Sequence, residues 1–234
     1  MMKKNLALLC VLGCFVQPVL AANINISNFG VQADFKSFSE DMGSALSYKA
    51  VIPAEPLGIT GFDLGLEVSS TETKSLAKAT GTSDTNLIVP KLHIHKGLPL
   101  GIDFGAFYSS VANITLYGGE LRYAILEGGV AMPAIAVRGA MSKLSGVDQW
   151  SFSTRSLDIS ISKGFAMFTP YAGVGTVWVD SAPDASIVGL QKVSITQAKT
   201  LVGANLNLGL TNIAVEWDKT GAAASTSVKL GFRF

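Results

Sequence analysis

Two histidines, His93 and His95, are the residues in this sequence best suited to chemistry, and they are its only histidines. They are one residue apart, so in an extended strand both imidazoles point to the same face. Asp63 and Glu67 share the same two-residue alternation, and a neighbouring strand would bring their carboxylates within reach, as a metal site or a general base requires. Two histidines are few for a metal site, and the sequence contains no nucleophile elbow, phosphate-binding loop or zinc-helix motif. We therefore expect no catalytic residue, no metal and no cofactor.

The composition limits the class of protein that could position these residues. Of 234 residues, 48% are hydrophobic and only 15% are charged, against about 25% charged residues in ordinary soluble domains. The formal net charge is +1. These values exclude a disordered chain and a basic protein that binds nucleic acid. An apolar soluble domain or a membrane protein remains.

The first residues have the features of a secretory signal peptide. Lys3 and Lys4 precede an apolar run from Leu6 to Val16, and a small-residue cleavage site follows at Ala21 or Ala22. We therefore predict a signal peptide at 1–21. Lipoprotein processing at Cys14 is the alternative, although bulky Leu12 stands where a small residue is usual. Cys10 and Cys14 are the only cysteines, so the mature chain would contain none.

The remaining sequence alternates with a period of two, as β-strands between two different environments do. In Ala204–Leu210, for example, each Leu falls on one face and each Asn on the other. The most apolar stretch, Gly164–Val179, is interrupted by Pro170 and several Gly and Thr residues, so it does not meet the length of about 18 apolar residues that a membrane helix needs. Segments of about ten residues with this alternation are typical of transmembrane β-strands.

The connections between these segments distinguish a barrel from a soluble β-sandwich, because short periplasmic turns alternate with longer external loops in outer-membrane barrels. Counting from the last strand, Ser225–Phe234, back to the first, Gly58–Ser70, gives ten strands. The predicted short turns are Thr211-Asn212, Lys163-Gly164, Glu127–Gly129 and Lys96–Pro99, and the predicted external connections are Thr220–Ala224, Asp180–Thr196, Ser145–Ser151, Ala112-Asn113 and Thr71–Thr85. The fold class is thus an all-β membrane protein, a closed antiparallel transmembrane β-barrel over 58–234 with ten strands, or alternatively eight or twelve.

The segment before the first strand, 22–57, has a helical rather than a strand pattern. Asp34 is the predicted N-cap of an amphipathic helix, which ends before Pro53 and Pro56. The apolar residues at helical spacing are Phe35, Phe38, Met42, Ala45 and Leu46. We predict a short helix at the periplasmic end, either as a plug in the barrel mouth or on the membrane surface. Alternatively, Ser44–Ile52 forms a further strand.

The alternation places a set of charged residues on the inner face of the barrel. They are Asp63, Glu67, Lys91, His93, His95, Asp103, Glu120, Arg122, Arg138, Asp158, Glu216, Lys229 and Arg233. Such residues could form a salt-bridge network that fills the lumen, because buried charges must be paired. They could also line a constricted pore for small hydrophilic solutes. The sequence leaves both interpretations open.

The C-terminus carries a specific resemblance. Val228, Leu230, Phe232 and the terminal Phe234 alternate with polar residues or Gly, which resembles the C-terminal insertion signal of the Gram-negative bacterial outer-membrane β-barrel family. The resemblance implies a location in the outer membrane, contact with its lipids and insertion by the barrel-assembly machinery. Several aromatic residues near predicted strand ends, including Tyr108, Tyr117, Tyr123, Phe168, Tyr171, Trp178 and Trp217, are consistent with interfacial girdles.

The sequence favours a small passive channel for small solutes, with transport as its role. A closed barrel that supports membrane integrity is the alternative, and an outer-membrane lipid-modifying enzyme is a weaker one, because no acidic or Ser/His cluster falls at the external rim. We expect a monomer that is not an enzyme and does not bind nucleic acid.

Overall fold

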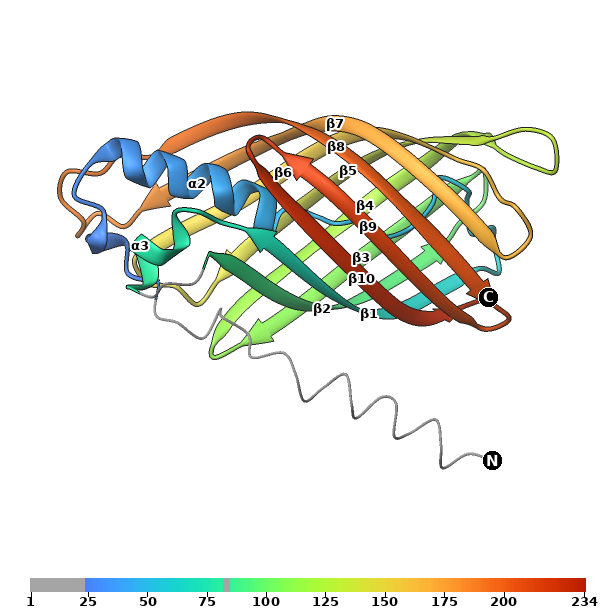
Figure 1. Ribbon diagram of the computed structural model, residues 1–234, viewed down its shortest axis with the longest axis horizontal. Helices are drawn as coiled ribbons and strands as arrows, with labels where there is room; N and C mark the ends of the chain where they lie inside the picture. The colour runs from blue at the N-terminus through green and yellow to red at the C-terminus, as the bar shows by residue number, and fades with distance from the viewer. Residues whose placement is uncertain (1–23, 82–84) are drawn as a thin grey trace, which may run out of the picture.

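The computed structural model describes residues 24–81 and 85–234 and shows a closed antiparallel barrel of ten strands (Figure 1). Each strand pairs with its neighbours in sequence, and β10 closes the barrel against β1. The strands are β1 (Phe62–Glu72), β2 (Asn86–Gly97), β3 (Ile102–Val111), β4 (Ile114–Glu127), β5 (Ala134–Ser145), β6 (Trp150–Ser162), β7 (Phe168–Pro183), β8 (Val193–Leu208), β9 (Thr211–Thr220) and β10 (Ala223–Arg233). The predicted fold class and strand number are confirmed. The predicted signal peptide lies outside the described residues.

The two ends of the barrel carry different connections. We call the end with the C-terminus and the β2–β3, β4–β5, β6–β7 and β8–β9 connections the turn end, and the opposite end the loop end. The predicted connections fall in the predicted order, with boundaries shifted by a few residues. Thr211 and Asn212, for example, were predicted as a turn but are the first residues of β9, and the turn lies at Gly209-Leu210. Ala112 and Asn113 between β3 and β4 both have positive φ, 49° and 69°. This turn therefore has the backbone handedness of a tight type I′ hairpin rather than of a long external loop.

The N-terminal segment lies inside the barrel. A short 3-10 helix, η2 (Ile26–Asn28), precedes α2 (Gln32–Leu46), which enters the lumen at the loop end (Figure 1). Ser39 Oγ donates a hydrogen bond to Ser181 Oγ at 2.8 Å, and Ser44 Oγ donates one to the carbonyl of Ala223 at 3.2 Å. Residues 47–61 then pass through the lumen to the start of β1 at the turn end.

The position of α2 corrects the prediction that the helix would lie at the same end as the C-terminus. Helical spacing defines an apolar face but does not say how far the following chain extends, and here residues 47–61 cross the barrel before β1 begins. Asp34 is not the N-cap, since the helix begins at Gln32 with Val31 before it. Asp34 instead pairs with Lys78 of α3 (Leu76–Thr80) in the β1–β2 connection. The alternative strand at Ser44–Ile52 does not form.

The two halves of the barrel have opposite polarity. In the loop-end half, α2 packs in an apolar core of Phe35, Phe38, Met42 and Leu46 against wall residues that include Leu87, Leu116, Leu144, Trp150, Phe152, Val177 and Val179. In the turn-end half the interior is charged and the outer wall is apolar, with exposed residues such as Leu66 and Val215. The helix thus completes a core of the kind found in soluble proteins, and the charged half has the inverted polarity of a membrane barrel.

Within the described residues, no helix has the length and apolarity needed to span a membrane.

Candidate functional site

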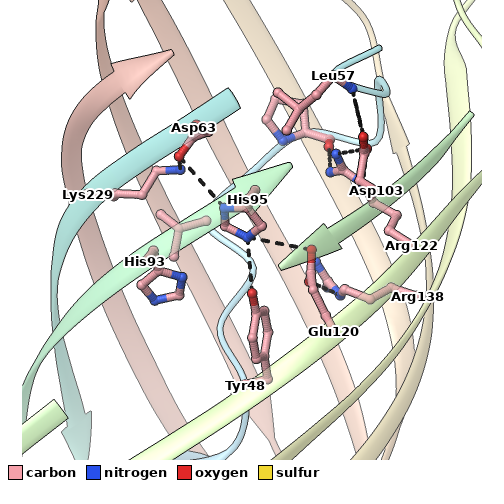
Figure 2. A network of polar contacts seen from close by, with 12 residues as sticks. Tyr48, Leu57, Asp63, His93, His95, Asp103, Glu120, Arg122, Arg138 and Lys229 are labelled. Atoms are coloured by element: carbon pink, nitrogen blue, oxygen red, sulfur yellow. Dashed lines mark hydrogen bonds and ion pairs between the residues drawn. The ribbon is translucent and has the colours of Figure 1, made fainter. Parts of the chain in front are cut away.

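The charged interior of the turn-end half is the candidate site, and His95 lies at its centre (Figure 2). His95 is fully buried on β2. Its Nδ1 lies 3.7 Å from Asp63 Oδ1 on β1, and its Nε2 lies 3.6 Å from Glu120 Oε1 on β4 and 3.0 Å from the Tyr48 hydroxyl. Tyr48 belongs to residues 47–61, which cross the lumen and which we call the crossing segment. The imidazole of His95 therefore joins the wall to the crossing segment.

The contact between His95 on β2 and Glu120 on β4 depends on a glycine in β3, the strand between them. Gly105 of β3 pairs with both His95 and Glu120 in register. A Cβ at Gly105 would lie 2.4 Å from Cδ2 of His95 and 2.8 Å from Cγ of Glu120. The absent side chain at this position is what allows the two polar groups to meet over β3.

We predict that Gly105→Ala will destabilise the protein by about 1–3 kcal/mol, the usual effect of overpacking a filled interior. Gly139→Ala is the matched control, because a Cβ at Gly139 would meet no atom within 4 Å. Urea unfolding of the refolded variants in lipid vesicles measures both. Equal stability of the two variants would contradict the claim that the missing side chain at Gly105 allows His95 and Glu120 to meet.

A second set of wall residues forms ion pairs between neighbouring strands. Lys91 Nζ lies 3.1 Å from Glu67 Oε1, and Lys229 Nζ lies 2.7 Å from Asp63 Oδ1. His93 is in contact with the second oxygen of Glu67. These groups pair within the wall itself, which offsets part of the cost of burying charge.

Two arginines extend the network around the barrel. Arg138 Nη2 lies 2.6 Å from Asp158 Oδ1, and its Nε lies 3.5 Å from Glu120 Oε2. Arg122 Nη2 lies 2.5 Å from Asp103 Oδ2, and Arg122 also donates to the carbonyl of Pro53 in the crossing segment. Arg122 therefore holds both the wall and the segment.

The crossing segment is bound along its length by charged groups of the wall. Lys49 Nζ donates to both carboxylate oxygens of Asp218 at 2.7 and 2.8 Å. The backbone N–H of Val51 donates to Glu216 Oε2 at 3.1 Å, and that of Leu57 donates to Asp103 Oδ1 at 3.1 Å. Backbone polar groups buried away from water need such partners.

The structure places every predicted inward-facing residue in the interior, and all but one are buried. The exception is Arg233 near the turn end, which is half-buried. Sequence reasoning missed Tyr48, Lys49, Asp218 and Lys199, whose Nζ donates to the carbonyl of Tyr48 at 3.0 Å. Asp218 and Lys199 share the alternation of their strands, so the pattern contained a signal for them. Nothing in the pattern of residues 47–61 indicated that Tyr48 and Lys49 would meet the wall.

The chemical capacity of the site is limited by its burial. Among residues 24–81 and 85–234, no group of three or more His, Cys, Asp or Glu side chains is placed to hold a metal ion. His93 and His95 are both 0% exposed, so neither is in contact with solvent. The arrangement suits a structural role, in which charged groups neutralise one another and hold the crossing segment.

The proposed insertion signal lies on the strand that closes the barrel. Val228, Leu230 and Phe232 face outward on β10 opposite Val68, Leu66 and Leu64 of β1. The backbone of Phe234 exchanges hydrogen bonds with that of Phe62, at 2.7 and 3.0 Å. Recognition of this strand by the barrel-assembly machinery stays a prediction.

Comparisons with solved structures found outer-membrane barrels among the similar chains. No protein-family model matches the chain, and no curated protein matches its sequence. The KdgM porin in complex with disordered oligogalacturonate is 6% identical with a TM-score of 0.40, and the match covers 74% of this chain and 99% of the porin. Neisserial surface protein A is 9% identical with a TM-score of 0.32, and the match covers 74% of this chain and 94% of that one. The translocator domain of autotransporter NalP from Neisseria meningitidis is 10% identical with a TM-score of 0.36, covering 86% and 96% of the two chains. At these identities, and with each of these TM-scores below 0.5, the likeness carries no argument about function.

Proposed function

We propose that this protein is an outer-membrane β-barrel that is closed by its own N-terminal segment and acts as a structural element of the membrane. Burial of the wall charges carries the proposal. Among the described residues, fourteen charged or imidazole side chains of the wall are each at most 3% exposed: Asp63, Glu67, Lys91, His93, His95, Asp103, Glu120, Arg122, Arg138, Asp158, Lys199, Glu216, Asp218 and Lys229. A water-filled pore would leave such side chains in contact with water, as the polar lining of a porin is.

The helix supports a permanent closure. Phe35, Phe38 and Met42 are completely buried in the loop-end core. Each contributes about 1.5–3 kcal/mol through burial of its side chain. Withdrawal of α2 would lose these contributions together, so spontaneous opening would be rare. The proposal includes no catalytic step, since the imidazoles and carboxylates are closed off from solvent.

A passive channel for small solutes, which the sequence favoured, is the second candidate function. One observation supports it: Lys91–Glu67, Lys229–Asp63 and Arg138–Asp158 pair within the wall and do not depend on the crossing segment. If residues 47–61 moved aside, a polar lining with paired charges would remain. This candidate requires the segment to move, whereas the structural role does not.

Single-channel conductance of the refolded mature protein in a planar bilayer distinguishes the two functions. We expect no conductance from the wild type or from Lys36→Met, which alters an exposed i,i+4 pair with Glu40 on α2. Steady conductance of the wild type would overturn the closed barrel. Openings in Lys49→Met, but not in Lys36→Met, would favour the channel, because Lys49 is a main ionic contact of the crossing segment.

A further inference from the structure

The connections at the turn end expose an unusual number of apolar side chains. We call these residues the apolar turn crown: Leu100, Val130, Met132, Phe165, Met167 and Leu210. Leu100 is 82% exposed, Leu210 is 65% and Phe165 is 59%. They come from all four hairpin connections at this end. The loop end differs, since exposed polar residues such as Lys74, Asn113, Asp148 and Ser186 occupy its connections. Exposed apolar surface of this extent marks an interaction with a membrane or another protein.

The outer wall shows where the membrane ends on the opposite side. Tyr108, Tyr117, Trp178 and Trp217 are exposed on the outer face and form an aromatic girdle toward the loop end, as expected at a membrane interface. The outward positions beyond them are polar: Ser110, Thr115, Asp180 and Lys219. Tyr171, which the sequence grouped with these aromatics, faces the interior and is 4% exposed.

The wall beyond the girdle belongs in water. Arg155 of β6 pairs with Trp178 in register and faces outward, where it forms an ion pair with Asp180 at 3.2 Å. Its side chain is 70% exposed. An Arg or Lys on the lipid face costs about 2–4 kcal/mol near the bilayer midplane and little at the interface. The girdle is therefore the limit of the lipid-covered wall on the side of the loop end.

On β3 and β9, the wall between this girdle and the turn end is too short to span a membrane by strands alone. From Tyr108 to Ile102 at the start of β3, the wall rises about 15 Å, taking about 3.3 Å per residue and a tilt of about 40°. The apolar band of outer-membrane barrels is about 25 Å tall. The same height of about 15 Å separates Trp217 from Thr211 at the start of β9. Strands β3 and β9 therefore reach the required height only if their turn-end connections, with Leu100 and Leu210, lie within the apolar region. The longer β4 rises about 25 Å from Tyr117 to Glu127 by itself.

The backbone of the turn crown is suited to a low-water environment. Lys163 Nζ donates hydrogen bonds to the carbonyls of Gly129 and Val130, both at 2.7 Å, and to that of Met132 at 3.3 Å. The N–H of Phe165 donates to the carbonyl of Phe168 at 2.7 Å. Lipid demands that backbone polar groups find such partners within the protein.

We propose that lipid covers the apolar turn crown, so that the membrane extends from the aromatic girdle to the turns themselves. The occupant of this surface is the bilayer leaflet at the turn end, because the crown continues the lipid-facing wall through Ile161, Phe168 and Leu208. The helix-filled loop-end half then stands outside the membrane as a compact polar-walled unit. This placement explains the soluble-type core of the loop-end half. On the loop-end side of the girdle the wall is apolar inside and polar outside, as in a soluble protein, whereas on the turn-end side the polarity is reversed.

Nitroxide labels on single cysteines test this placement in the refolded mature protein, with one copy in each phosphatidylcholine–phosphatidylglycerol nanodisc. Labels at Leu100 and Phe165 report the crown, and a label at Leu66 reports the lipid-facing wall. Labels at Val188 in the β7–β8 connection and at Ser151, which faces outward on β6, report the loop end. All five positions are on exposed or outward-facing residues, so the labels leave the interior unchanged.

We expect Leu100 and Phe165 to match Leu66, with frequent collisions with oxygen and few with a water-soluble nickel chelate. Val188 and Ser151 should show the reverse, with nickel collisions several-fold more frequent. Nickel accessibility of both crown positions at the level of Val188 would overturn the proposal. Protection of the crown from both reagents would also overturn it, because a protein surface rather than lipid would then cover the turns. Neither result depends on whether the barrel conducts.

Discussion

Replacing Lys49 by Met should lower the free energy of unfolding by about 3–5 kcal/mol, the usual cost of removing one partner from a buried ion pair. Lys49 and Asp218 are both fully buried, and Lys49 Nζ also donates to Ser225 Oγ at 3.0 Å. The variant keeps the volume of the side chain but leaves the Asp218 carboxylate without its cation. Urea unfolding in lipid vesicles, followed by tryptophan fluorescence, measures the loss.

Two further variants separate the ion pair from the substitution itself. Lys36→Met makes the same change in an exposed pair with Glu40, where the nitrogen–oxygen distance is 3.9 Å, and should cost less than about 1 kcal/mol. The double variant Lys49→Met, Asp218→Leu should recover most of the stability, because an apolar pair can replace a buried ion pair. If Lys49→Met costs no more than Lys36→Met, the crossing segment is not held by this contact.

Replacing Phe38 by Ala should lower the free energy of unfolding by about 3–5 kcal/mol, as Phe-to-Ala changes in filled cores do. Phe38 is fully buried on α2. Its ring centroid lies 5.0 Å from that of Trp150 on the wall and 5.0 Å from that of Phe29 before the helix. The variant removes the contact that joins the N-terminal segment to β6 and leaves a cavity beside an indole.

Tryptophan emission, to which Trp150 contributes together with Trp178 and Trp217, provides a second measurement beside the unfolding free energy. Phe38→Ala should shift tryptophan emission to longer wavelength if water enters the cavity, and should lower the urea midpoint. Val31→Ala is the control, because Val31 is 55% exposed just before the same helix. Equal stability of Phe38→Ala and Val31→Ala would show that α2 is not part of the core, and would remove the main support for permanent closure.

Much of the barrel could be predicted because its strands separate two environments. An outward charge in lipid and an inward apolar residue in a polar lumen are both unfavourable, so the two-residue alternation places residues such as Glu67, Arg122 and Arg138 inside without knowledge of any contact. The same constraint predicted ten strands and the order of the connections. The β3–β4 turn at Ala112 and Asn113 was placed correctly, and its two residues are too few for a typical external loop.

The sequence alone determined that a helix precedes the barrel, which strand faces are polar, and that the chain ends in an outward apolar strand. Only the tertiary structure decided where α2 lies, which end is closed, and that Lys49 meets Asp218. The physical reason is that periodicity reports only the local environment of a residue. These contacts join residues that are far apart in sequence, and the residues meet only when the barrel closes around residues 47–61. Their partners depend on the path of that segment, which has no repeating pattern.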